Sequence, residues 1–233
     1  DRFLSIIAHD LRSPVFALMG LTEMLSGEAE HMDRSDIKNL ATTVHEAAFG
    51  LAGLIENLLE WALLRRNNIE LQPVNISLKV LADHTIQSLQ AASSKKNITV
   101  HNLIMDVHTA VGDEKMIATV LRNLISNGIK FTHRGGKVTI SSVKNKPGEI
   151  TVRVADTGVG IPAERQADLF SITQKYRTPG TDGEPSSGLG LVLCRELLSQ
   201  NSGTIWIEDN QENGSVFCFS LPAEYIPEMT HAQ

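Results

Sequence analysis

Long apolar runs are missing from the sequence. No segment approaches the roughly 18 apolar residues that a membrane-spanning helix needs, and no signal-peptide pattern opens the chain. Runs of basic residues are missing as well, and the net charge is −6, which argues against a general binder of nucleic acid or anionic membranes. Cysteine occurs twice, as Cys194 and Cys218, in apolar surroundings and without a CxxC pair. We therefore expect two buried thiols in a reducing compartment.

The chain also lacks an initiator methionine, and its helical pattern begins within the first residues. We expect a soluble, cytoplasmic fragment of a longer protein, and leave open whether an input segment or a membrane anchor precedes it. The 233 residues, 42% hydrophobic and 21% charged, are enough for one large or two ordinary globular domains.

Two segments near the N-terminus repeat apolar residues every three or four positions, which predicts two amphipathic helices. The first set is Leu4, Ile7, Leu11, Val15, Leu18 and Leu25, and the second is Ile37, Leu40, Val44, Ala47, Leu51, Leu54, Leu58 and Trp61. A polar break at 26–33 makes them an antiparallel hairpin. Because two helices bury their stripes poorly, we expect a homodimer with a four-helix bundle. Docking of the hairpin on the rest of the chain is the alternative. Pro14 should bend the first helix.

The helical period stops after Arg65, where the composition changes. This predicts a helical hairpin at 1–66, a linker at 67–72 and a second domain at 73–233. In the second domain we expect helices at 77–93, 114–131 and 190–201, and strands at 98–103, 109–111, 137–143, 149–156, 204–209 and 215–221. This order indicates an α+β fold, in which the hairpin precedes an α/β sandwich. Its mixed, mostly antiparallel sheet should carry helices on one face.

The commonest nucleotide-binding signatures are absent: neither the phosphate loop GxxxxGK[ST] nor the HRD and DFG motifs of protein kinases occurs. A different glycine motif is present, because Asp156 ends a predicted strand and is followed by Gly158 and Gly160. A carboxylate accepts the hydrogen bond of an adenine amino group, and glycine lets the backbone approach a flat ring. A plain tight turn after the strand is an equally good interpretation.

A second glycine motif, at Gly188 and Gly190, opens the helix predicted at 190–201, whose N-terminal amides can bind phosphate oxygens. The preceding segment, 171–186, is rich in turn residues and predicts a long loop. In this loop Lys175 and Arg177 would provide positive charge for a triphosphate. An ordinary surface loop is the alternative.

Three polar residues of the helix predicted at 114–131, Asn123, Asn127 and Lys130, line up beside its apolar face. Asparagine is a poor helix former, so two on one stripe call for an explanation. An amide oxygen suits one position of an octahedral Mg²⁺ ion, and a lysine can meet a phosphate directly. A solvated polar face is the alternative.

Six short segments together resemble the signature of a known family. They are Ala8-His9-Asp10-Leu11-Arg12-Ser13-Pro14, Leu121-Arg122-Asn123-Leu124-Ile125-Ser126-Asn127-Gly128-Ile129-Lys130-Phe131-Thr132, Asp156-Thr157-Gly158-Val159-Gly160, Leu169-Phe170, Gly188-Leu189-Gly190-Leu191 and Gly214-Ser215-Val216-Phe217. In this order they resemble the histidine box, the asparagine box, the two glycine boxes with the phenylalanine box between them, and the closing strand of sensor histidine kinases of two-component systems. The resemblance covers nearly the whole chain. It implies a dimerisation hairpin followed by a Bergerat-type ATP-binding domain.

The resemblance implies that the chain phosphorylates its own His9 from Mg-ATP and passes the group to an aspartate of a response-regulator receiver domain. It implies that Asn127 is the Mg²⁺ ligand, that Asp156 recognises adenine, and that Asn123 and Lys130 contact the phosphates. The four glycines of the glycine boxes would shape the pocket. Bergerat-fold hydrolases carry a glutamate four residues before the Mg²⁺ asparagine, and Asn123 at that position favours phosphotransfer.

Helical phase supports His9 independently of the family resemblance. At about 100° per residue, His9 lies roughly opposite the first apolar stripe, so we expect it on an exposed face that an ATP domain could reach. The resemblance makes Asp10 the general base or orienting partner of His9; a solvated surface carboxylate is the alternative.

Two other functions stay open: an ATP-binding pseudokinase that signals by shape, and a Bergerat-fold hydrolase or serine kinase. The intact His9, Asn127 and Asp156 argue against the first.

Overall fold

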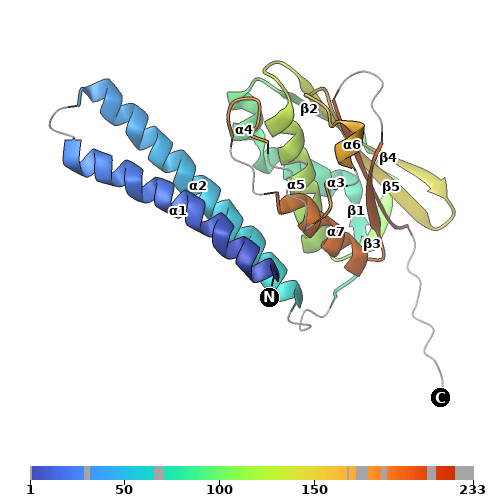
Figure 1. The fold of residues 1–233 in the computed structure, drawn as a ribbon. Helices are drawn as coiled ribbons and strands as arrows, with labels where there is room; N and C mark the ends of the chain where they lie inside the picture. Colours follow the sequence, from blue (N-terminus) through green and yellow to red (C-terminus); the bar gives the residue numbers. More distant parts are fainter. Residues whose placement is uncertain are drawn as a thin grey trace. The chain divides into compact units, whose positions relative to one another are not determined.

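The computed structural model describes residues 2–28, 32–65, 71–166, 168–171, 178–184, 188–208 and 214–223. Its elements are, in chain order, α1 (Arg2–Glu28), α2 (Arg34–Arg65), β1 (Val74–Ser77), α3 (Leu78–Ser88), α4 (Gln90–Lys95), β2 (Thr99–Asn102), β3 (Thr109–Gly112), α5 (Glu114–Phe131), β4 (Lys137–Lys146), β5 (Glu149–Asp156), α6 (Ala163–Gln166), α7 (Gly190–Gln200), β6 (Thr204–Glu208) and β7 (Val216–Pro222). The chain divides into two units, Asp1–Ile69 and Glu70–Gln233 (Figure 1). The division falls inside the segment predicted as a linker, 67–72.

The first unit is an antiparallel pair of helices, α1 and α2, that lie side by side along their length (Figure 1). Asp33 caps α2, because its Oδ1 accepts hydrogen bonds from the backbone N–H groups of Ser35 and Asp36 at 2.7 and 2.8 Å. Helix α1 runs through Pro14 without interruption, and the bend expected at this residue stays a prediction. Among the described residues, no helix combines the length and apolarity needed to cross a membrane.

The second unit contains a five-stranded sheet with the order β2-β4-β5-β7-β6, in which only the pairing of β2 with β4 is parallel. The prediction of a mixed, mostly antiparallel sheet is confirmed. A second sheet of two strands pairs β1 with β3, so that Val74 lies opposite Gly112. The sequence analysis missed β1 and placed β3 without this partner.

Helix α5 packs against both α3 and α7, the three helices pack against the five-stranded sheet, and the core lies between them. Helix α5 contributes the largest share, through a face of Met116, Ile117, Val120, Leu121, Leu124, Ile125 and Ile129. From the sheet, the central strands add Val138, Ile140, Ile150, Val152, Val154, Phe217, Phe219 and Leu221. Both cysteines are buried and form no disulfide, as expected. The helix predicted at 77–93 is two helices, separated at Leu89.

Helix α5 is held at its N-terminus by two polar side chains. Asp113 caps it, because its Oδ1 accepts hydrogen bonds from the N–H groups of Lys115 and Met116. Asn201, buried after the end of α7, accepts a hydrogen bond from the Asp113 N–H at 2.7 Å and donates one to Leu197 at 2.8 Å. The start of α5 and the end of α7 are therefore joined, which sets how the two helices lie against each other.

Candidate nucleotide-binding site

A buried carboxylate lies at the end of β5, in the middle of the sheet. Asp156 is 5% exposed, and its Oδ1 accepts hydrogen bonds from the N–H groups of Gly158 at 2.8 Å and Ser215 at 3.2 Å. Burial raises the pKa of Asp156 to about 6, and the two hydrogen bonds act in the opposite direction by favouring the charged form. The side chain is thus fixed by the turn that follows β5 and by the start of β7. A carboxylate in this position can accept a hydrogen bond from a flat polar ligand.

Glycines surround Asp156 at places where a side chain would not fit. A Cβ added at Gly158 would meet the Phe131 carbonyl and would lie 2.8 Å from Asp156 Oδ1. Gly160 and Gly214 both have positive φ, at 69° and 93°, and a Cβ at Gly160 would lie 3.2 Å from the Gly214 carbonyl oxygen. The predicted tight turn after β5 is therefore present, and its role in nucleotide binding stays a prediction.

Helix α5 passes directly beside Asp156 at Gly128. A Cβ at Gly128 would lie 3.6 Å from the Asp156 Cβ and 3.1 Å from a methyl group of Val138. The contact places Asn127, the adjacent residue of α5, near the carboxylate end of β5. Asn127 is partly exposed, while its neighbours Gly128 and Leu124 are buried. Asn127 therefore adjoins the residue of α5 that packs against Asp156.

The second glycine motif contacts the same helix one turn earlier. Gly190 is the first residue of α7, and a Cβ there would lie 2.8 Å from Asn123 Oδ1. The Asn123 amide nitrogen donates to the Thr119 carbonyl at 3.0 Å, which directs the amide oxygen toward α7. Gly188 has φ of 69°, a left-handed conformation that favours glycine. The structure thus brings the asparagine helix and the second glycine motif together at Asn123.

Lys130 lies in the last turn of α5, at the C-terminal end of the polar row that also contains Asn123 and Asn127. Its ammonium is 5.2 Å from the centre of the Phe131 ring. Burial and the nearby Lys96 lower its pKa to about 8, and Glu184 acts in the opposite direction. A partly buried ammonium of this kind suits a phosphate group, which would replace the lost hydration.

Four of the predicted site residues cannot be placed by their side chains. Lys175 and Arg177 lie outside the described residues, and of His9 and Asp10 the structure describes only the helical backbone in α1. Their roles stay predictions.

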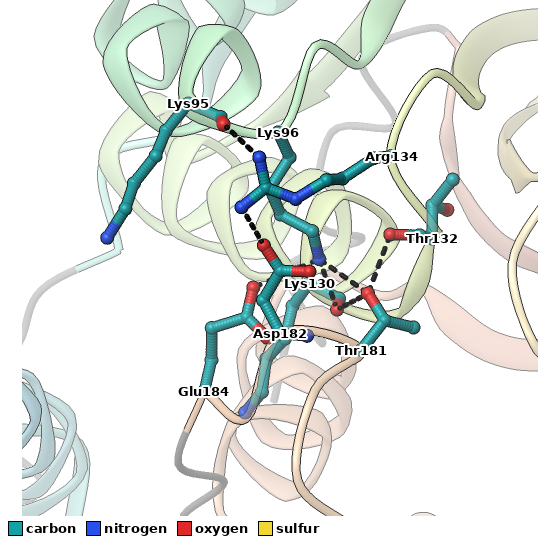
Figure 2. A network of polar contacts seen from close by, with 8 residues as sticks. All are labelled: Lys95, Lys96, Lys130, Thr132, Arg134, Thr181, Asp182 and Glu184. Atoms are coloured by element: carbon teal, nitrogen blue, oxygen red, sulfur yellow. Dashed lines mark hydrogen bonds and ion pairs between the residues drawn. The ribbon is translucent and has the colours of Figure 1, made fainter.

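The sequence analysis missed a polar cluster beside Lys130, which Figure 2 shows. Lys96 is 4% exposed, and its ammonium donates to the Lys130 carbonyl, to Thr181 Oγ1 and to Glu184 Oε1 at 2.8, 2.7 and 3.0 Å. Arg134 pairs with Asp182 at 2.7 Å on the outer side of the cluster. In the sequence Lys96 follows another lysine and resembles part of a solvated surface, so no local pattern could have identified it.

Two family models match the chain. The "His Kinase A (phospho-acceptor) domain" matches residues 1–67, and the "Histidine kinase-, DNA gyrase B-, and HSP90-like ATPase" family matches residues 112–225. These two matches lie in the first and the second unit of the structure, respectively.

Curated relatives are sensory kinases. The chain is 31% identical to the adaptive-response sensory kinase SasA of Rippkaea orientalis over 94% of its own length and 57% of that protein. It is 29% identical to the sensor protein EvgS of Escherichia coli O157:H7, over 98% of its length but 19% of that protein. The chain therefore spans little more than half of SasA and a fifth of EvgS.

Solved structures share the fold. The Acinetobacter baumannii histidine kinase AdeS matches 93% of the chain and 98% of its own, with a TM-score of 0.72 and 22% identity. The catalytic domain of the histidine kinase ThkA matches 66% of the chain and 97% of its own, with a TM-score of 0.57 and 29% identity. A further structure shows ThkA in complex with the response regulator protein TrrA, and it matches 96% of the chain and 62% of its own, with a TM-score of 0.70 and 22% identity.

Proposed function

Because the chain belongs to the sensor histidine kinases of two-component systems, we propose that it transfers the γ-phosphoryl group of ATP to its own His9. The phosphoryl group would then pass to an aspartate of a response-regulator receiver domain. The reaction would take place in the cytoplasm, where ATP is available. The observation that carries the donor half of this proposal is the contact of α5 with Asp156 at Gly128, the residue that follows Asn127 in the chain.

The donor residues divide into a base end and a phosphate end. Asp156 would accept a hydrogen bond from the adenine amino group. The backbone at Gly158 and Gly160, which carries no side chain, would lie close to the ring. Asn123 and Lys130 would contact phosphate oxygens. A Cβ at Gly158 or Gly128 would press on the Phe131 carbonyl or on Val138 and Asp156, so both glycines are needed for the close packing that fixes Asp156.

The residues present offer Mg²⁺ one protein ligand, the Asn127 amide oxygen, and phosphate oxygens and waters would complete its coordination. The charge of the ion would stabilise the phosphoryl group during transfer. Gly188 and Gly190, which precede and begin α7, would present backbone N–H groups to phosphate oxygens. Lys175 and Arg177 would add positive charge from the loop before them.

In the acceptor half, a ring nitrogen of neutral His9 would attack the γ-phosphorus. The nitrogen–phosphorus bond would form as the bond to the bridging oxygen breaks, and ADP would leave. Asp10 would take up the proton from the other ring nitrogen or hold the ring in position. In the second reaction, a receiver carboxylate would attack the phosphohistidine and regenerate the imidazole. The solved complex of ThkA with a response regulator supports this choice of partner.

We further propose that the chain acts as a homodimer through α1 and α2. Of the side chains described in this hairpin, none is buried, and large apolar ones that are well exposed include Val15, on the predicted apolar stripe of α1, and Ile55 on α2. A second copy would cover these side chains in a four-helix bundle.

Labelling with γ-labelled ATP and Mg²⁺ tests the proposal. The wild-type chain should take up a label that is labile to acid and stable to base, and the His9→Gln variant should not. The matched control is His45→Gln, which changes an exposed histidine on α2 of the same hairpin and should leave the label intact. A label that survives His9→Gln would refute the assignment of the acceptor. A wild-type chain that binds ATP and takes up no label would favour the pseudokinase scaffold.

A further inference from the structure

The C-terminal end of α5 is held by groups from two distant parts of the chain. The last carbonyls of a helix have no partner within it, and here the Lys130 carbonyl accepts hydrogen bonds from the Lys96 ammonium at 2.8 Å and from the Thr181 N–H at 3.1 Å. The carbonyl of Thr132, which follows α5, accepts one from the Thr181 hydroxyl at 2.8 Å. Segment 178–184 is therefore fastened to the backbone at the end of α5.

The Thr181 hydroxyl is the centre of this attachment (Figure 2). It accepts a hydrogen bond from the Lys96 ammonium at 2.7 Å and donates one to the Thr132 carbonyl, so it acts as acceptor and donor at once. Lys96 is 4% exposed, and its third short contact goes to Glu184 Oε1 at 3.0 Å. A buried ammonium is stable only when it is paired and hydrogen-bonded, so the charge of Lys96 opposes release of the turn.

Segment 178–184 is also closed on itself. The Gly180 N–H donates to the Glu184 carbonyl at 2.8 Å, and the Asp182 N–H donates to Glu184 Oε2 at 3.0 Å. These two contacts join the two ends of the segment across Thr181. The contacts that hold Thr181 on α5 therefore also fix the place of Glu184.

The fixed turn bears on the phosphate end of the proposed site through the length of the chain. Only three residues, 185–187, separate Glu184 from Gly188, the first glycine of the second glycine motif. Because an extended chain spans at most about 3.6 Å per residue, Gly188 must lie within roughly 14 Å of Glu184. A fixed Glu184 narrows the positions open to the residues that lead into α7, so less conformational entropy is lost when they bind a ligand.

We propose that Thr181 and Lys96 are positioning residues for phosphate binding: together they keep segment 178–184 on the end of α5 and so pre-organise the chain that leads into the start of α7. The inference rests on the proposed function, since it takes Gly188 and Gly190 as phosphate contacts. Both residues act through the backbone that they hold. Release of the turn should weaken ATP binding, because the binding free energy must then also order this segment.

Two substitutions at Thr181 separate the hydroxyl from the rest of the side chain. Thr181→Val keeps the shape and removes the hydroxyl, so it should raise the Kd and the KM for ATP about tenfold, which corresponds to about 1.4 kcal/mol of ordering. Thr181→Ser keeps the hydroxyl and should stay within about twofold of wild type. Adenosine lacks phosphates, so its affinity should change less than about twofold in both variants. The matched control is Thr109→Val, the same change at an exposed threonine of β3.

Lys96→Met should reproduce the loss of ATP affinity. Combined with Thr181→Val it should cost little more than either change alone, because both break the same attachment. Amide hydrogen exchange follows the attachment directly. The Thr181 N–H, which donates to the Lys130 carbonyl, should exchange about tenfold faster or more in Thr181→Val, while amides in the middle of α5 keep their wild-type rates.

The experiment measures ATP affinity by calorimetry and adenosine affinity by ligand-observed NMR, on the full chain with Mg²⁺. Wild-type ATP affinity in Thr181→Val would overturn the inference. Equal losses of ATP and adenosine would overturn it as well, since they would indicate a role in the fold of the second unit alone. The same holds for an unchanged exchange rate of the Thr181 N–H. If Lys96→Met does not fold, the comparison of Thr181→Val with Thr181→Ser decides the question.

Failure of the proposed function has a different signature. In that case the wild-type chain itself would bind no ATP or would not label His9, whatever the variants at positions 96 and 181 do.

Discussion

Replacing Asp156 with asparagine should stabilise the second unit at neutral pH and abolish nucleotide binding. The asparagine oxygen can still accept the hydrogen bonds from Gly158 and Ser215, which lie 2.8 and 3.2 Å from Oδ1 in the wild type. The second carboxylate oxygen, Oδ2, is replaced by an amide NH₂ group. This group donates hydrogen bonds and would face the amino group of adenine, which is also a donor. One substitution should therefore improve folding and remove function.

The size of the stabilisation follows from the pKa of the buried carboxyl. Burial raises this pKa from 3.8 to about 6, so the folded chain prefers the neutral form. Above pH 6 the ionised group costs the folded state about 3 kcal/mol, from about two pKa units at about 1.4 kcal/mol each. Protonated Asp156 favours the folded state. This contribution to the free energy of unfolding is fully present below pH 3.8 and is lost as the pH rises through 6. At pH 5 the cost is about half as large, so the advantage of the variant should be smaller there.

Urea unfolding at pH 5 and pH 8 measures this difference. In a Trp61→Phe background, fluorescence reports on Trp206, which lies on β6 in the second unit. The Asp156→Asn variant should gain about 1 to 1.5 kcal/mol more over its parent at pH 8 than at pH 5. Asp106→Asn, at an exposed carboxylate paired with Lys79, is the control and should show no such pH dependence. Equal or lower stability of Asp156→Asn at pH 8 would show that the two hydrogen bonds outweigh burial.

Two further predictions concern α5. Because the pKa of Lys130 is lowered to about 8, mainly by burial, ATP affinity should fall as the pH rises through 8, and Lys130→Arg should hold its affinity to pH 9.5. ATP titrations from pH 7 to 9.5 check this, and a flat wild-type profile would contradict it. Gly190→Ala should lower stability by about 1 to 2 kcal/mol, because the new Cβ would lie 2.8 Å from Asn123 Oδ1. Adding Asn123→Ala should restore stability but not ATP binding in urea unfolding and titration; a fully stable Gly190→Ala would refute the contact.

Sequence periodicity predicted the long elements because their burial repeats over many residues. Helix α5 has an apolar face that recurs through five turns, and its predicted bounds, 114–131, match the structure. Strand β1 escaped prediction because four residues are too short to show alternation, and its partner β3 lies more than 30 residues later. The break at Leu89 has no glycine or proline to signal it, so propensity alone would continue the helix.

The candidate site was predicted where the chemistry is carried by short motifs, and missed where it depends on packing. Asp156, Asn123 and Gly190 come from three separate motifs. Asn123 lies on α5, and the structure brings the other two residues to this helix: Asp156 packs at Gly128, and Gly190 packs at Asn123. Lys96 carries no motif, and its buried ammonium meets partners that lie far away in the sequence, at Lys130, Thr181 and Glu184. The acceptor residues His9 and Asp10 stay predictions, as do Lys175 and Arg177.

Position 123 links the choice of reaction to the packing of the fold. The Asn123 amide nitrogen bonds to the helix carbonyl of Thr119, and its oxygen occupies the space over Gly190, where even a Cβ would come within 2.8 Å. A glutamate at 123, as hydrolases carry, has an additional methylene and a charge, and it could not take the place of this amide without moving the start of α7. The side chain found here accepts hydrogen bonds without acting as a base for water. The close contact of α5 with α7 therefore disfavours a water-activating glutamate at position 123, which agrees with the proposed phosphotransfer.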